Sequence, residues 1–355
     1  MTNLNKFFQE ESIEKNICRW NLNVYNCQDD AYYRSVYYIK AVIAIGVSLL
    51  ASILIIYRIG IRRRNLVTPY GIASIDGLLI FLLLYSYTMI FHAITILKAE
   101  YVENMIIQEF SFQLQYIFVL IAIQVYLTGT LNASPRYRGS SFYYPRPRVV
   151  NIISLFLLII WSSAELTLTY LVGKKRNFFY TSGDSEKNDD IKNYRLIIYA
   201  RYIIFGMACI ITFVLFLLFG LNLNRAAQRS LEEMYRNKKI KSNVVIPIRM
   251  AILKMRWING SCSAIMAAFA ILFIIMGIME QYIFERSTSG YANISKFLCV
   301  AMNLIPPALT FIVLLSIVYG EARTDIISIF PSTHFEEEDY QMNYTKQSQD
   351  SGDLI

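Results

Sequence analysis

The sequence predicts an all-α fold, a bundle of seven transmembrane helices with its N-terminus outside the cell. Of its 355 residues, 55% are apolar and only 17% are charged, whereas soluble proteins carry about 25% charged residues. The mean hydropathy is +0.39. Seven apolar runs are each long enough to cross a hydrocarbon core of about 30 Å as a helix. This composition argues against a cytosolic globular enzyme.

The seven apolar runs cover residues 36–57, 72–97, 105–131, 149–172, 196–221, 257–283 and 294–320. Runs of this length are expected to be helical, because only helices and closed barrels satisfy backbone polar groups in lipid. They predict a helical domain over residues 36–320 behind an extracellular N-terminal tail, residues 1–35. The tail lacks the pattern of a cleavable signal peptide, so the first run is expected to act as a signal anchor.

Positive charge predicts the orientation of the bundle. The loops at 58–70 and 132–148 each carry four arginines and no acidic residue, and the segment 222–256 carries nine basic residues against two glutamates. The other three loops mix both signs of charge. Since cytoplasmic loops are enriched in Lys and Arg, the N-terminus is predicted outside and the C-terminus inside.

The chain after the seventh run divides into two predicted parts. Ala322, Ile326, Ile329 and Phe330 recur at helical spacing, which indicates a short amphipathic helix over 321–330 on the inner membrane surface. Residues 331–355 are acidic and poor in apolar side chains, so a disordered cytoplasmic tail is expected there.

Two of the five cysteines, Cys18 and Cys27, lie in the predicted outer tail. An oxidising location permits a disulfide between them, and both thiols staying free is the open alternative. The sequence Asn293-Ile294-Ser295 is a glycosylation sequon on the predicted outer face, although it adjoins the seventh run and the bilayer.

Ionisable residues inside the runs are candidates for function, because each costs about 2.5–3.5 kcal/mol to insert. Asp76 is expected to face the bundle, where it would hold an ion, pair with serines of the first and seventh helices, or change protonation. A neutral Asp76 that bonds a neighbouring helix is the alternative. Glu165 is expected either to line a ligand pocket or to make a helix contact. Glu109, Arg201 and Glu280 lie nearer the outer ends, where they are interpreted as interfacial anchors.

Catalytic chemistry finds little support in the sequence. The two histidines, His92 and His334, are too few for a zinc cluster, and no nucleophile motif or phosphate-binding glycine loop is present. Lys296 is the only lysine of the seventh run and lies at its outer end, which argues against bound retinal. No enzyme activity and no cofactor are therefore expected. Pro306 and Pro307 predict a kink in the seventh helix.

Seven runs, an outer N-terminus, basic inner loops and a terminal amphipathic helix together resemble a G-protein-coupled receptor. Residues 72–78, Ile-Ala-Ser-Ile-Asp-Gly-Leu, are similar to the LAxAD motif of the rhodopsin-like class, with Asp76 at the sodium-site carboxylate. Ser48 falls about where that class has its first-span Asn. Tyr319 resembles the tyrosine of NPxxY. The resemblance implies an ion site and switch at these three residues.

A second group of residues resembles the coupling region of the same class. Pro135-Arg136-Tyr137 stands where that class has Asp/Glu-Arg-Tyr. The chain departs from the pattern, because Pro135 replaces the acid and Leu315-Ser316 replaces the Asn-Pro before the last tyrosine. The sixth run also lacks CWxP, and no cysteine pair is available to link the third run to the second outer loop.

The resemblance implies a plasma-membrane receptor that rearranges its helices when an extracellular ligand, as yet unknown, binds. Arg136, Tyr137, Arg249 and Lys254 would then line a cleft for a heterotrimeric G protein. Membrane lipids are further expected partners, since the basic inner loops suit anionic lipids equally well, and nucleic acid is not expected. The alternative is a transporter of a small solute or ion that uses Asp76 and Glu165, which would favour two related halves. No such repeat is evident.

Overall fold

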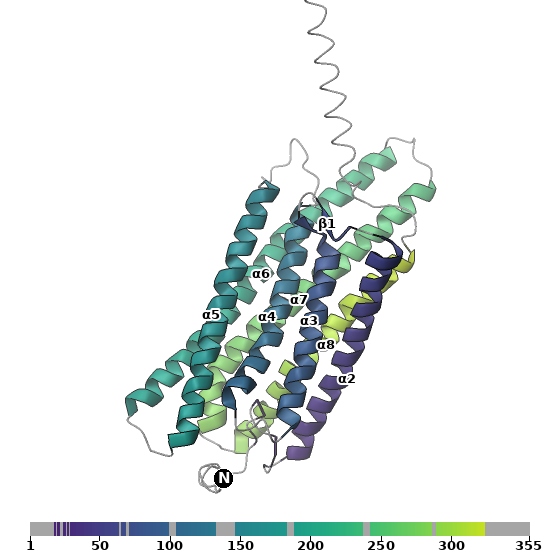
Figure 1. Ribbon diagram of the computed structural model, residues 1–355. Coiled ribbons are helices and arrows are strands. Elements are labelled where there is room, and N and C mark those ends of the chain that lie inside the picture. The colour runs from purple at the N-terminus through teal and green to yellow at the C-terminus, as the bar shows by residue number, and fades with distance from the viewer. Residues whose placement is uncertain are drawn as a thin grey trace, which may run out of the picture.

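A computed structural model describes the helical domain and part of the segment before it (Figure 1). It describes residues 18, 20–21, 24–25, 27, 29–63, 65–68, 71–98, 104–132, 146–182, 188–236, 242–285 and 289–323. The elements are α2 (Asp30–Ile55), the π-helix η1 (Ile56–Ile61), β1 (Val67–Thr68), β2 (Gly71–Ile72), α3 (Ser74–Leu97), α4 (Met105–Asn132), α5 (Pro147–Ser182), α6 (Asn188–Arg236), α7 (Ser242–Glu285) and α8 (Ser289–Arg323).

Seven of these helices are long and apolar enough to cross a membrane, which confirms the predicted all-α fold. The protein is an integral, multi-pass membrane protein. The spans are Asp30–Ile61, Ser74–Leu97, Met105–Asn132, Pro147–Phe178, Asn193–Asn222, Met255–Met279 and Ala292–Tyr319. The first helix begins six residues before its apolar run and the fourth ends later than its run. Hydropathy locates the part of a helix in hydrocarbon, whereas the helix itself continues into the polar flanks.

Helices α6 and α7 are much longer than the bilayer requires. They contain 49 and 44 residues, or about 75 and 65 Å at 1.5 Å per residue. Both extend past the other helices at the end opposite the N-terminal segment, as Figure 1 shows. Most of the predicted third inner loop, residues 222–256, is therefore helical. Between α2 and α3, in contrast, the chain forms only the two-residue strands β1 and β2.

The seven helices form a closed ring in which each packs on its neighbours in sequence. Contacts link every consecutive pair from α2 to α8, and α2 closes the ring against α8. α4 contacts α6 as well as its sequence neighbours, and it has the largest buried share of the seven spans. α5 has the smallest buried share. α4 is therefore the central helix, and α5 lies at the periphery.

The first and last spanning helices run parallel. Hydrogen bonds join Tyr33 to Ser295, Lys40 to Asn303, and Arg58 to Glu321, with sequence separations of 262, 263 and 263. A constant separation along both helices means that they advance in the same direction. An odd number of spans requires this arrangement, so the two ends of the helical domain lie on opposite sides of the membrane.

Glycine permits a close approach of α3 and α4. A Cβ atom on Gly129 of α4 would lie 2.6 Å from the Ser74 Cβ and 2.7 Å from the Ser74 Cα of α3. Gly77 is similarly close, since its Cβ would lie 2.6 Å from a methyl carbon of Val125. Small residues allow backbones to approach within membranes, where packing drives association. The two glycines therefore fix how α3 and α4 meet.

The prolines of α8 do not break the helix, which continues from Ser289 to Arg323. Proline has no N–H, so Pro306 leaves the carbonyl of Met302 without its intrahelical donor. The Tyr116 hydroxyl of α4 donates to this carbonyl at 3.1 Å. The Thr310 hydroxyl donates to the Pro306 carbonyl at 2.9 Å. A neighbouring helix thus completes the hydrogen bonding that the proline removes.

The predicted amphipathic helix over 321–330 is described only at its start. Residues 321–323 belong to α8 itself, and Glu321 is buried against Arg58 rather than lying on a membrane surface. The remaining residues of that segment, and the predicted tail over 331–355, lie outside the described residues.

Candidate functional site

A buried ionic cluster ties three helices together at the end opposite the N-terminal segment. Arg58 of η1 donates from Nε to Asp76 Oδ1 of α3 at 2.5 Å and from Nη2 to Asp76 Oδ2 at 3.4 Å. Its Nη1 donates to Glu321 Oε1 of α8. The three residues are 3%, 2% and 5% exposed. Arg58 therefore bridges two carboxylates from different helices, and charge-assisted bonds of this kind are the strong ones.

Asp76 is buried in the bundle, and the side chain that it pairs with is an arginine rather than a serine. Ser48 is buried on α2, yet it lies ten residues before Arg58, or about 15 Å along the helix. The structure therefore does not bring Ser48 to Asp76. Tyr319 is 53% exposed, and it precedes Glu321 by two residues, which places it on the other face of α8. The three residues of the expected ion site do not form one site.

Sequence reasoning missed Arg58 because it counted this residue as the first of an inner loop. The helix does not end at the apolar run but continues as the π-helix η1 through Ile61. Within that element Arg58 is the buried residue. π-Helical turns are rare and are often found at functional positions. An arginine directly after an apolar run, with an aspartate in the next run, is the signal that could have suggested the pair.

A second buried ionic cluster joins α4, α5 and α6 toward the other end. Arg201 of α6 donates from Nη1 to Glu109 Oε2 of α4 at 2.5 Å, and Arg176 of α5 donates from Nη1 to Glu109 Oε1. All three residues are buried. The interpretation of Glu109 and Arg201 as interfacial anchors was therefore wrong. Hydropathy gives the depth of a residue in a span but not the face it occupies, and opposite charges on facing helices can pair inside the bundle.

Glu280, the third expected anchor, lies on α7, but its side chain is outside the described residues.

Glu165 of α5 is buried beside the second cluster. Gln113 of α4 donates from Nε2 to Glu165 Oε2 at 2.9 Å, and Arg201 is close enough for its charge to act on the carboxylate. Three buried oxygens here have no hydrogen-bond partner among the described residues: Glu165 Oε1, Gln113 Oε1 and Thr169 Oγ1. Glu165 and Asp76, which the transporter alternative would use as ligands, lie near different ionic clusters on different helices.

A third polar centre, which the sequence reasoning missed, surrounds Lys40 of α2. Its ammonium donates to Asn303 Oδ1 of α8 at 2.9 Å and lies 5.6 Å from the ring centre of Tyr37. Lys40 is only 1% exposed. The Asn303 amide donates in turn to the Cys299 carbonyl at 2.9 Å. A lone lysine hardly lowers the hydropathy of an apolar run, but its presence within the first run was the available signal.

The N-terminal segment packs onto the end of the bundle near Lys40. Cys18 and Cys27 are joined by a disulfide, one of the two alternatives that the sequence left open. The Trp20 side chain is buried, and the Trp20 carbonyl accepts a hydrogen bond from the Tyr37 hydroxyl at 2.9 Å. Tyr25 donates to the carbonyl of Leu97 at the end of α3. Residues 18–27 are thus attached to two helices.

The sequon residue Asn293 lies within α8, where its side chain is exposed. The neighbouring Lys296 pairs with Asp29 at 2.7 Å. Asn293 is therefore close to where α2 and the N-terminal segment meet α8.

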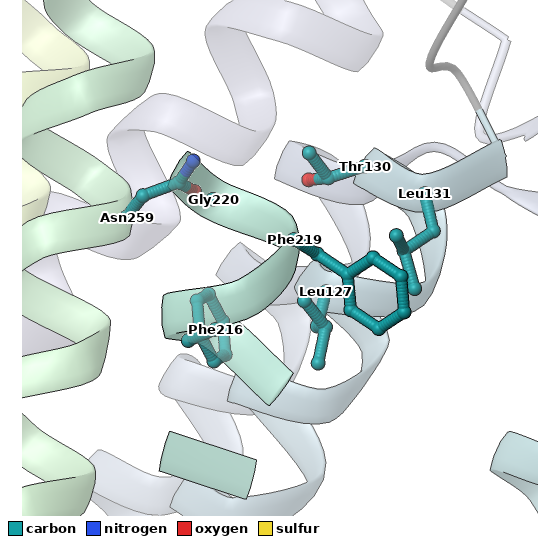
Figure 2. Close-up of a pocket in the computed structure, with 7 residues that line it drawn as sticks. All are labelled: Leu127, Thr130, Leu131, Phe216, Phe219, Gly220 and Asn259. Atoms are coloured by element: carbon teal, nitrogen blue, oxygen red, sulfur yellow. The ribbon is translucent and has the colours of Figure 1, made fainter. Parts of the chain in front are cut away.

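A small pocket lies between α4, α6 and α7 at the end where the long helices project (Figure 2). It is lined by Leu127, Thr130, Leu131, Phe216, Phe219, Gly220 and Asn259. Its open volume is about 10 Å³, which is barely enough for one water molecule. The three helices therefore meet here around a small pocket.

A neutral hydrogen bond between described residues spans this junction. The Tyr126 hydroxyl of α4 donates to Asn259 Oδ1 of α7 at 3.0 Å. The Tyr126 ring stacks on Phe216 of α6, with centroids 6.2 Å apart and an interplanar angle of 9°. Tyr126 therefore contacts both of the long helices at once.

The four residues expected to couple to a G protein are close in sequence to the residues that form this junction. Arg136 and Tyr137 follow α4 but lie outside the described residues. Arg249 and Lys254 lie on α7, where their side chains are outside the described part. The cleft expected from these four residues is therefore a prediction.

Comparison of the chain with protein families, with characterised proteins and with solved structures gives no match. Functional inference consequently depends on the geometry of the bundle.

Proposed function

We propose that the protein is a plasma-membrane receptor that transmits an extracellular signal to a heterotrimeric G protein by rearranging its helices. The observation that carries this proposal is the junction of the central helix α4 with the two long, basic helices α6 and α7. A small pocket lies between the three helices, and a neutral hydrogen bond joins α4 to α7. Opening this junction would create an inner cleft for a partner helix.

The distribution of buried ion pairs supports movement at this junction. One cluster ties η1, α3 and α8, and the other ties α4, α5 and α6. Among the described side chains, α7 contributes to neither. Breaking a buried ion pair costs about 3–5 kcal/mol, whereas a neutral hydrogen bond contributes about 1 kcal/mol. A displacement of α7 would therefore break neither buried ionic cluster among the described residues.

An aromatic cluster connects the central helix α4 to α6 and α7, so that a change at α4 can be transmitted to α7. The ring of Tyr116 makes edge contacts with Phe205 of α6 and with Phe269 and Phe273 of α7, at centroid distances of 6.2, 5.4 and 4.9 Å. The Tyr116 hydroxyl also bonds the proline-containing part of α8 through the Met302 carbonyl. Packed elements of this type switch between discrete arrangements. A ligand that repacks these rings would shift the population of α7 positions.

The test is nucleotide exchange on purified G-protein α subunits. The protein would be reconstituted in nanodiscs and mixed with a panel of α subunits, each with βγ, and GTPγS uptake would be measured. We expect at least one subunit to exchange nucleotide faster than with empty nanodiscs, and Arg136→Ala to abolish the increase. Arg148→Ala is the matched control, since Arg148 is an exposed arginine at the start of α5.

Transport of a small cation is a second candidate because of the three unpartnered oxygens around Glu165. Oxygen atoms of this kind suit hard cations. Proteoliposomes loaded with a sodium- or potassium-sensitive dye would show flux that Glu165→Gln removes. If flux is found and no α subunit responds, the receptor proposal fails.

A further inference from the structure

Lys40 is a buried lysine whose described contacts contain no carboxylate. Its ammonium bonds the neutral amide oxygen of Asn303 and lies over the ring of Tyr37. The other groups that its charge influences are His92 and Cys299. An ammonium removed from water carries a large desolvation penalty, and one neutral amide oxygen offsets only part of it. Lys40 therefore lacks a counter-charge within the described part of the chain.

The described buried carboxylates have other partners or neighbours. Asp76 and Glu321 bond Arg58, which lies 18 residues beyond Lys40 on the same helix, or about 27 Å away. Glu109 accepts from two arginines of α5 and α6, and Glu165 lies beside one of them. None of these four residues is in contact with Lys40. The missing counter-charge is thus a local feature of the α2–α8 interface.

Unpartnered polar atoms lie on His92, Trp20 and Gln108, in the part of the bundle around Lys40. His92 Nε2, Trp20 Nε1, Gln108 Nε2 and Gln108 Oε1 are buried and have no hydrogen-bond partner among the described residues. The Trp20 indole and the Gln108 amide nitrogen carry N–H groups that can only donate, whereas Gln108 Oε1 accepts. Buried donors are normally satisfied, so these donors, together with a buried lysine that contacts no described carboxylate, point to an absent acceptor with negative charge.

Ring contacts show that these groups belong to one layer. The ring of Tyr37 lies 5.7 Å from that of His92, and Phe112 lies 5.5 Å from His92 and 6.4 Å from Trp20. Gln108 precedes Phe112 by one helical turn on α4. The layer sits beneath the disulfide-linked segment 18–27, which the Tyr37 bond to the Trp20 carbonyl holds in place.

We propose that a small monovalent anion, either a halide ion or the carboxylate group of a small acid, binds at the Lys40 ammonium beneath Trp20. The anion supplies the missing counter-charge and accepts hydrogen bonds from the unpartnered donors of the layer. The site does not depend on G-protein coupling, because binding would occur in the isolated protein. A negative result here therefore leaves the receptor proposal standing, and the reverse also holds.

The experiment measures thermal unfolding of the purified protein in detergent, with isethionate as the only starting anion. Chloride and formate are titrated separately at constant ionic strength. A ligand that binds the folded state raises Tm in a saturable manner. We expect this for chloride, for formate, or for both, and the active ion identifies the source as a halide, a carboxylate or either one.

Lys40→Met should weaken the saturating response at least tenfold in anion concentration. Lys296→Met is the matched control. Lys296 is a partly exposed lysine of α8, and it already pairs with Asp29. The control should keep the wild-type response. An equal response in wild type and Lys40→Met would overturn the site, as would the absence of any saturable response to both ions.

A second measurement uses the wild-type protein alone, in case Lys40→Met does not fold. Crystals grown in bromide should show an anomalous difference peak beside the Lys40 Nζ atom, and addition of excess isethionate should leave it in place. Bromide peaks only at exposed surface positions would contradict the proposal.

Discussion

The Tyr116 hydroxyl donates a hydrogen bond to the Met302 carbonyl at 3.1 Å, which is the carbonyl that Pro306 deprives of its intrahelical donor. The central helix α4 thereby replaces a missing bond of α8. The same tyrosine ring packs against Phe269 and Phe273 of α7. Tyr116 is thus the residue through which the proline-containing helix and α7 contact the centre of the bundle.

Tyr116→Phe tests this relationship while keeping the ring. The variant leaves a buried carbonyl without a donor, so we expect a loss of about 1–3 kcal/mol in the free energy of unfolding. Replacing Pro306 by Ala restores a backbone N–H to the Met302 carbonyl, so Tyr116→Phe should cost less in a Pro306→Ala background. Unfolding in mild detergent would be measured for the four proteins of this cycle.

The control for that cycle is Tyr87→Phe, since Tyr87 is an exposed tyrosine of α3 and should change stability little. An equal cost of Tyr116→Phe in both backgrounds would mean that the hydroxyl does not serve the carbonyl freed by the proline.

Arg58→Met tests the ionic cluster of η1, α3 and α8. The variant leaves Asp76 and Glu321 buried without their shared cation, so we expect it to cost about 3–5 kcal/mol. Removing both negative charges by Asp76→Asn and Glu321→Gln should recover part of the loss in the Arg58→Met background. The midpoint of thermal unfolding reports each step. No recovery would show that Arg58 stabilises the protein by packing rather than by charge.

Gly129→Ala tests the close approach of α3 and α4. The added methyl would lie 2.7 Å from the Ser74 Cα, so the helices must separate and the variant should cost about 1–3 kcal/mol. Gly46→Ala is the matched control, because a Cβ at Gly46 meets nothing within 4 Å. If both variants unfold at the wild-type temperature, the two helices do not pack at this glycine.

The sequence predicted the number and position of the spans because hydropathy over some twenty residues averages away individual errors. The rotation of each helix was beyond its reach. Glu109 and Arg201 looked like anchors near the membrane surface, yet they pair with each other inside the bundle. The partner of Asp76 was missed for a related reason, since Arg58 was assigned to an inner loop but belongs to the π-helix η1. Side-chain partners depend on which faces meet, and a single sequence does not record them.

The disulfide and the Lys40 site also depend on contacts that the sequence alone does not reveal. Two cysteines nine residues apart permitted a bond, but its presence follows from how residues 18–27 fold onto α2 and α3. Lys40 was hidden because one charge barely alters an apolar run. Its significance comes from Asn303, which is 263 residues away in sequence.

The hydrogen bond between Tyr126 and Asn259 carries the central functional claim, because it joins α4 to α7 at the proposed cleft. Tyr126→Phe removes this bond but keeps the stacking on Phe216. The open arrangement should therefore become more populated, by a factor of about 5 for a bond of about 1 kcal/mol. Tyr170→Phe, at an exposed tyrosine of α5, is the matched control.

The most direct measurement is the ligand-independent rate of GTPγS uptake by α subunits in the presence of nanodiscs containing wild type, Tyr126→Phe or Tyr170→Phe. The account predicts that at least one α subunit responds to the wild type, that Tyr126→Phe raises this rate several-fold, and that Tyr170→Phe leaves it unchanged. Uptake equal to that with empty nanodiscs for all three proteins, across the whole panel, would contradict it.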